Sequence, residues 1–139
     1  MRVLPRVAAH RGQSLLEFAL VLPALLMIVM GTFDLGWAVY AQNTIALAAR
    51  EGARTAIIVT RSDDAIRARV KNTSQGLALS DADITITPAG GTAPWYRPRA
   101  APVTVSVRYN FVPVTPLIGN IVGSGGSIPL HADATMIVE

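Results

Sequence analysis

Apolar residues fill one long segment near the start of the chain. From Phe18 to Ala41 only Asp34 carries a charge. As a helix this segment would measure roughly 36 Å, and the hydrocarbon core of a bilayer is about 30 Å thick. The pattern therefore predicts a membrane-spanning helix at about residues 18–41.

The helical pattern does not end with this span. Helix-forming residues continue to about Val59, so we expect one helix over residues 13–59, roughly 69 Å long. Small residues recur on one face of its outer half, where another element can approach closely. This face consists of Ala38, Ala41, Ile45, Ala48, Gly52 and Ala56. It is expected to pack either within the chain or between subunits, and the sequence leaves both open.

A short second helix is expected at residues 60–76. Ser62 is a suitable N-cap, Asp63 and Asp64 suit the positive end of the helix dipole, and Gly76 is expected to stop the helix. The basic residues near its end are Arg67, Arg69 and Lys71, which we expect to lie on a solvated face. Its narrow apolar edge consists of Ile66 and Val70.

Beyond residue 77 the apolar period changes from 3.6 to 2. Residues 83–87, 103–111 and 128–138 alternate apolar and polar side chains, which predicts three half-buried strands of an antiparallel sheet. Pro129 indicates that the last strand begins at a sheet edge. We expect the long helix to cover the apolar face. The predicted fold class is α+β, with residues 60–139 forming one small domain.

The charge of the chain does not indicate a nucleic-acid partner. The formal net charge is +3, and Arg2, Arg6 and Arg11 supply all of the excess. The basic residues beyond Gly12 are scattered and balanced by acidic ones. There is no cysteine, which excludes disulfides and thiol catalysis.

Catalytic chemistry is poorly represented. His131, the only histidine after residue 12, is predicted on the polar face of a strand. Asp81 and Asp83 form a D-x-D pattern that calcium could use, but turn chemistry explains it equally well. No hydrolase, phosphate-loop or zinc-protease motif is present. We therefore expect no enzyme activity, no catalytic residue, no cofactor and no metal site.

One loop has the composition of a contact surface. Residues 88–102 are rich in proline and glycine and include two aromatic and two arginine side chains. The candidate contact residues are Trp95, Tyr96, Arg97 and Arg99. They are expected either to touch a neighbouring molecule or, as the alternative for Trp95, to tuck onto the sheet.

The start of the chain combines a basic leader with a carboxylate at the edge of the apolar segment. Residues 1–12 are basic, and Pro5 and Gly12 are expected to interrupt regular structure there. Glu17 is the fifth residue after Gly12, and Phe18 follows it. Because the arginines precede the span, we expect the N-terminus to stay in the cytoplasm and residues after the span to lie outside.

These features together resemble the class III signal of type IV prepilins and pseudopilins. Residues 11–54 are more closely similar to the TadE-like family, pilin-like proteins of the tight-adherence (Tad, or Flp) pilus system. The matching pieces are "RGQ", the pair Glu17–Phe18, "LVLP" with Pro23, the pattern of Gly31, Asp34 and Gly36, and "AAREGAR". The sheet-forming second half departs from the much shorter major Flp pilins and fits a minor pilin or pseudopilin better.

The resemblance implies cleavage between Gly12 and Gln13 by a prepilin peptidase. Cleavage would create an α-amine at Gln13 with a pKa of about 8, which could pair with Glu17 of a neighbouring helix and set the register of subunits. The implied partners are other pilin subunits, the pilus assembly platform and membrane lipid. The implied location is the inner membrane, followed by a pilus at the cell surface or in the periplasm.

Two residues break the rules of a plain membrane anchor. Pro23 should kink or loosen the helix, because it leaves the carbonyl of Ala19 without its donor. Asp34 lies near the outer interface, where it is expected to be solvated or to meet a partner. The alternative functions are a principal filament subunit, an uncleaved envelope module with a permanent anchor, and a secreted protein cut after Ala41.

Overall fold

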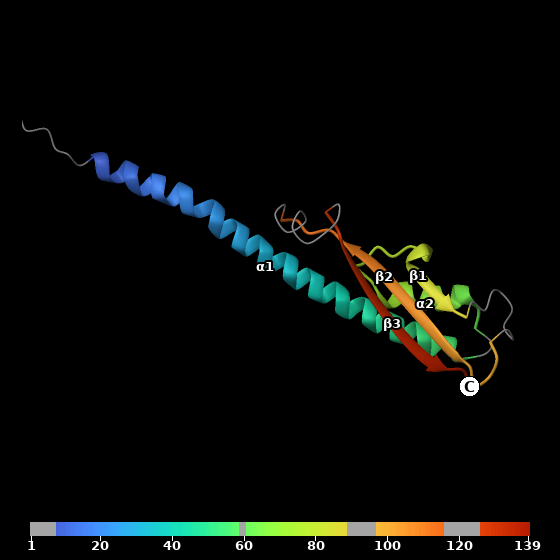
Figure 1. Cartoon of the computed structure of the whole chain (residues 1–139). Helices are drawn as coiled ribbons and strands as arrows, with labels where there is room; N and C mark the ends of the chain where they lie inside the picture. Colours follow the sequence, from blue (N-terminus) through green and yellow to red (C-terminus); the bar gives the residue numbers. More distant parts are fainter. Residues whose placement is uncertain (1–7, 59–60, 89–96, 116–125) are drawn as a thin grey trace, which may run out of the picture.

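The chain folds into one long helix whose second half carries a small α+β domain (Figure 1). The computed structural model describes residues 8–58, 61–88, 97–115 and 126–139, with only the backbone described for residues 8–11. The elements are α1 (Ala8–Ala56), α2 (Asp63–Thr73), a 3-10 turn η1 (Asp81–Asp83), β1 (Ile84–Thr87), β2 (Pro102–Phe111) and β3 (Ile128–Ile137). The expected α+β fold class is confirmed.

The ends of α1 differ from those expected. The helix already includes Ala8, so Gly12 lies inside it and does not interrupt it. One glycine costs a helix only about 1 kcal/mol, which its neighbours offset. At the other end α1 stops at Ala56, where Ile58 donates to the carbonyl of Thr55 at 3.4 Å and tightens the last turn. The expected end at Val59 lies outside the described residues.

The three strands form an antiparallel sheet in the order β1-β2-β3. Val103, Val105 and Val107 of the central strand are fully buried, and the intervening side chains face away from the core. In β3 the residues that alternate with the exposed ones are half-buried, as expected. β3 is an edge strand, so the inference drawn from Pro129 is confirmed.

The small-residue face of α1 packs within the chain. Ala41, Ile45, Ala48 and Ala56 are completely buried against the sheet and α2. Gly52 permits the closest approach, since a Cβ there would lie 2.6 Å from Cγ2 of Val70 and 3.1 Å from Cγ1 of Val105. Of the two alternatives, intramolecular packing is the one that the structure shows, which removes this face from contacts between subunits.

The polar ends of α2 follow the sequence expectation closely. Ser62 accepts from the backbone N–H of Ala65 at 3.3 Å, and Asp63 and Asp64 occupy the first turn. Gly76 has a φ of +95°, a conformation that favours glycine, in the turn after the helix. The buried edge of the helix consists of Ile66 and Val70, as predicted.

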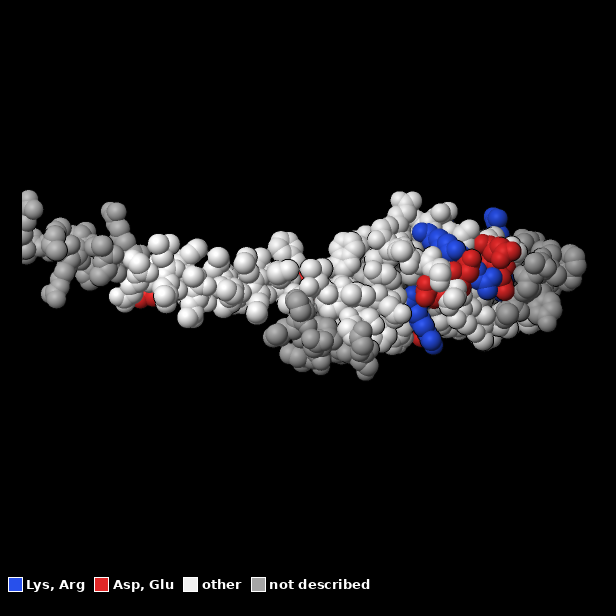
Figure 2. All heavy atoms as spheres, turned by 90° about the horizontal axis from the view of Figure 1, so that it is seen from above, with Lys and Arg blue, Asp and Glu red and all other residues white. Residues whose placement is uncertain are grey.

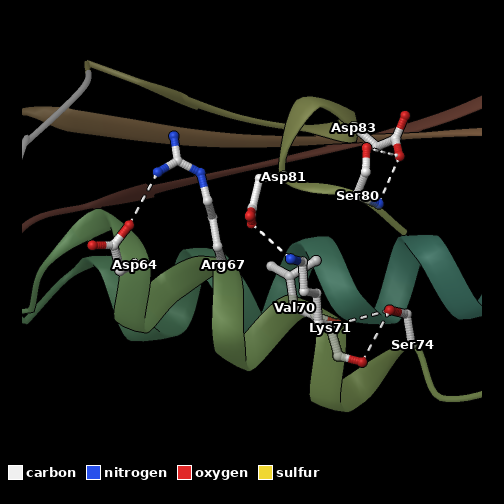
Figure 3. Close-up of polar contacts among 8 residues, drawn as sticks. All are labelled: Asp64, Arg67, Val70, Lys71, Ser74, Ser80, Asp81 and Asp83. Carbon is white, nitrogen blue, oxygen red and sulfur yellow. Dashed lines mark hydrogen bonds and ion pairs between the residues drawn. The ribbon is translucent and has the colours of Figure 1, made fainter. Parts of the chain in front are cut away.

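Ionic contacts join α2 to its surroundings. Arg69 of α2 pairs with Glu51 of α1 at 2.8 Å, and Lys71 pairs with Asp81 of η1 at 2.8 Å. Figure 3 shows the second of these pairs beside the turn in which Ser80 bonds the Asp83 carboxylate. The basic residues of α2 thus help to fix this helix against α1 and η1.

Candidate membrane and assembly interface

The first half of α1 projects from the domain without a covering layer. Most of its large apolar side chains between Leu15 and Phe33 are exposed, from 40% for Met30 to 75% for Phe33. Figure 2 shows the charged side chains gathered over the globular end, whereas the projecting helix is almost entirely uncharged. Contiguous apolar surface of this size marks a membrane or protein contact. By length and composition, α1 is the one described helix that could cross a membrane.

The residues at the predicted processing site lie on this uncovered helix. Gly12 is exposed, and a Cβ added to it would have no heavy atom within 4 Å. Glu17 is exposed one turn later and accepts a hydrogen bond from Nε2 of Gln13 at 3.2 Å. Phe18 is 61% exposed. Within the chain, Gln13 and Glu17 are therefore neighbours, and Glu17 is accessible to a second molecule.

Pro23 lies inside α1, which continues through it as one helix. Its side chain is exposed, and so is Gly36, where an added Cβ would meet no atom within 4 Å. Gly31 is half-buried and lines a hollow together with Phe111 and Ile128 at the end of the sheet. The residues that carry the resemblance to the family are therefore spread along the helix and do not form one site.

Asp34 has a role that the sequence did not predict. Its side chain is only 5% exposed, and its carboxylate accepts the backbone N–H groups of Val114 at 2.9 Å and Thr115 at 2.8 Å. These residues follow β2, so Asp34 joins the helix to the loop at the end of the sheet. The expectation of a solvated carboxylate is wrong, because the partner of Asp34 lies within the same chain. No short-range pattern could have identified a contact across 81 positions.

Two aromatic residues mark the passage from the uncovered helix to the domain. The rings of Trp37 and Tyr40 lie 5.2 Å apart, and both side chains are nearly half exposed. The hydroxyl of Tyr40 donates to the carbonyl of Gln75 at 3.4 Å. Ala41, the next residue, is completely buried. The passage from exposed helix to domain core therefore falls between Tyr40 and Ala41.

Two of the four candidate contact residues of the loop before β2 lie within the described part of the chain. Arg97 is 3% exposed, forms an ion pair with Asp63 and donates to the carbonyl of Arg61 at 2.9 Å. The expectation that Arg97 is an exposed contact residue is therefore wrong, because its guanidinium bridges the start of α2. Arg99 is exposed. Trp95 and Tyr96 lie outside the described residues.

The described residues also contain no candidate metal centre, since no three metal-ligating side chains come together. Asp83 instead accepts from the backbone N–H of Ser80 at 2.8 Å, and Asp81 pairs with Lys71. The side-chain hydrogen bond from Lys71 lowers the pKa of Asp81, which keeps this carboxylate ionised. Asp83 thus takes part in the turn that begins at Ser80, whereas Asp81 forms an ion pair with α2.

Residues 12–54 match the family model described as TadE-like protein. No curated protein and no solved structure matches the chain. The match covers about a third of the sequence, from Gly12 through the uncovered half of α1 and the buried Gly52 to Arg54. It supports the resemblance to the TadE-like family, a group of structural pilus-associated proteins with an N-terminal apolar helix.

Proposed function

We propose that this chain is a minor pilin or pseudopilin of a Tad-type pilus, held in the membrane and assembled through α1. The observation that carries the proposal is the uncovered apolar half of α1, joined without interruption to a helix half that forms the core of the domain. Because the helix is continuous, the position of its apolar half in a membrane or filament core fixes the position of the exterior domain. The match over residues 12–54 supports the same role.

The membrane orientation is N-terminus inside, with the α+β domain outside. Three arginines and no acidic residue precede Glu17, which lies at the start of the span. A protease added to intact spheroplasts is expected to digest the chain after residue 59. Full protection of this region would contradict the orientation.

Processing between Gly12 and Gln13 is the next element of the proposal. The peptidase must accept a tight conformation at the cut, for which a residue without a side chain is suited. Since nothing surrounds Gly12, a larger side chain there would leave the fold unchanged and act on peptidase recognition alone. The matched control is Gly36, which also has free space around it.

Intact-mass measurement of the native protein tests the processing step. The wild type is expected to begin at Gln13, Gly12→Leu to remain full length in the membrane, and Gly36→Leu to be processed normally. A native protein that begins at Met1 would contradict the pilin role and favour a permanently anchored envelope module.

Glu17 is proposed to act in assembly. Its carboxylate is exposed on the uncovered helix and lies one turn from Gln13, which carries the new ammonium after cleavage. A neighbouring subunit can supply the same ammonium, and the two charges neutralise each other in a low-dielectric filament core. A lone charge in such surroundings is costly, so unmatched subunits are rejected.

Incorporation into pili, compared with the amount in the membrane, tests this role. Glu17→Ala and Glu17→Gln are expected to insert normally but to lose most of their incorporation. Thr32→Ala is the control, because Thr32 is a polar residue of the same helix that bonds only the carbonyl of Ile28 among the contacts described for it. If both Glu17 variants enter pili at the wild-type level, the pairing account is wrong.

A further inference from the structure

The loop that follows β2 begins at the end of the domain nearest the uncovered helix (Figure 1). Two of its apolar side chains are exposed. Val112 is 66% exposed and Val114 is 72% exposed. Pro113 and Thr115, which alternate with them, are buried. The loop therefore has an inner side that packs on the protein and an outer side that consists of the two valines.

Asp34 fixes the position of this loop along α1. Its two hydrogen bonds to the N–H groups of Val114 and Thr115 are short, and its carboxylate is almost completely covered. Val112 and Val114 then border a shallow hollow with Phe33 and Trp37 of the helix. The exposed valines thus continue the apolar surface of α1 sideways, away from the helix axis.

The length of the uncovered helix sets the depth of the loop. From Phe18 to Trp37 the helix would measure about 30 Å, which matches a hydrocarbon core of about 30 Å. Asp34 therefore lies within one turn of the outer boundary of the core when Phe18 lies at the inner one. Trp37 and Tyr40 follow within two turns, at the level where aromatic side chains are enriched in membrane proteins.

We propose that Val112 and Val114 form a second membrane contact, inserted at the boundary between acyl chains and headgroups of the outer leaflet. Lipid is the occupant because the valines are continuous with the apolar helix and lie at the calculated edge of the hydrocarbon core. The carboxylate beside them is already bonded to the backbone, so the surface that remains is apolar. This inference rests on the membrane span of the proposed function.

Such a contact has a consequence for orientation. One helix alone leaves a domain free to tilt about the point where it leaves the membrane. A second apolar contact, joined rigidly to the helix by Asp34, restricts that tilt. The domain would then face neighbouring subunits with one defined side before assembly begins.

Site-directed spin labelling tests the inference in the full-length chain. Because the protein has no cysteine, single variants Val112→Cys and Val114→Cys provide unique attachment sites. Leu25→Cys, in the uncovered helix, is the control for the span, and Asp64→Cys, whose side chain is 78% exposed on α2, is the control for water. The protein is reconstituted at low density into phosphatidylcholine–phosphatidylglycerol vesicles. Accessibility to oxygen is compared with accessibility to a water-soluble nickel complex.

We expect labels at Val112 and Val114 to favour oxygen over nickel, at a shallower depth than the label at Leu25, and the label at Asp64 to favour nickel. Water-like values at both valines with a lipid-like value at Leu25 would overturn the loop contact and leave the span intact. A water-like value at Leu25 would overturn both. Protection of the valines that disappears as protein is diluted into lipid would identify a second copy as the occupant and also overturn the proposal.

Discussion

The carboxylate of Asp34 in α1 accepts the backbone N–H of Thr115, 81 positions later in the chain, at 2.8 Å. A second bond to Val114 makes the same side chain a cap for two consecutive donors. Without it, both N–H groups would need other partners near the end of the sheet, where polar groups left unbonded are costly. Asp34 therefore connects the helix that leaves the membrane to the domain.

Replacing Asp34 by Ala is expected to free this loop while leaving the fold intact. Amide hydrogen exchange at Val114 and Thr115 should become faster, on the order of tenfold, because both groups lose their acceptor. Asp64→Ala is the control, since Asp64 is exposed and bonds only to Arg67 at 3.4 Å among its described contacts. Unchanged exchange in Asp34→Ala would mean that the loop is held by its apolar contacts alone.

Arg97 and Arg99 provide a matched pair of substitutions that tests the role of the loop before β2. Arg97→Ala leaves the buried carboxylate of Asp63 without its cation, so we expect a loss of roughly 3–5 kcal/mol in the free energy of unfolding. Arg99→Ala, at an exposed position, is expected to change it by less than about 0.5 kcal/mol. Denaturant unfolding in detergent micelles measures both. Equal effects would show that burial of the Asp63–Arg97 pair does not determine stability.

Gly52→Ala tests the close approach of α1, α2 and β2. The new methyl group would lie 2.6 Å from Val70, and overpacking of this kind typically costs about 1–3 kcal/mol. Higher helix propensity returns at most about 1 kcal/mol, so we expect a net loss of stability. In Gly36→Ala no atom lies close to the new methyl group, so the Tm should be unchanged or slightly higher. A more stable Gly52→Ala variant would contradict this packing.

The pair Glu51–Arg69 predicts part of the acid sensitivity of the domain. The hydrogen bond from Arg69 lowers the pKa of Glu51 below its ordinary value of 4.5. The folded state therefore holds its proton less tightly than the unfolded state, and the stabilisation is present above pH 4.5 but lost as the pH falls through the folded-state pKa. The Tm difference between wild type and Glu51→Gln should be constant above about pH 5.5 and shrink below pH 4.5.

A double-mutant comparison isolates this interaction from other acidic groups. In an Arg69→Gln background, Glu51→Gln should change Tm much less at any pH, because the main partner that lowers the pKa of Glu51 is absent and only the weaker effect of Arg54 remains. Asp81, whose pKa is lowered by Lys71, titrates equally in all four proteins and cancels in the comparison. A Tm difference that persists without Arg69 would assign the effect to another charge.

The sequence by itself determined which segments form helices and strands and which face of each is apolar. Alternation along β2 identified the buried face of Val103, Val105 and Val107, and the apolar segment identified the uncovered helix, because both patterns repeat over a few residues. The start of α2 followed from Ser62 for the same reason: a cap is a local bond. Its N-cap bond joins residues only three positions apart.

The tertiary structure decided which residues meet. The sequence does not show whether Asp34 and Arg97 face solvent, lipid or a partner, and only the folded chain brings Asp34 to Thr115 and Arg97 to Asp63. The small-residue face of α1 could likewise pack on a neighbouring subunit or on its own sheet. In the folded chain it packs on the sheet and α2. Local patterns record how a segment buries its apolar side, but pairing between distant residues depends on where the whole chain places them.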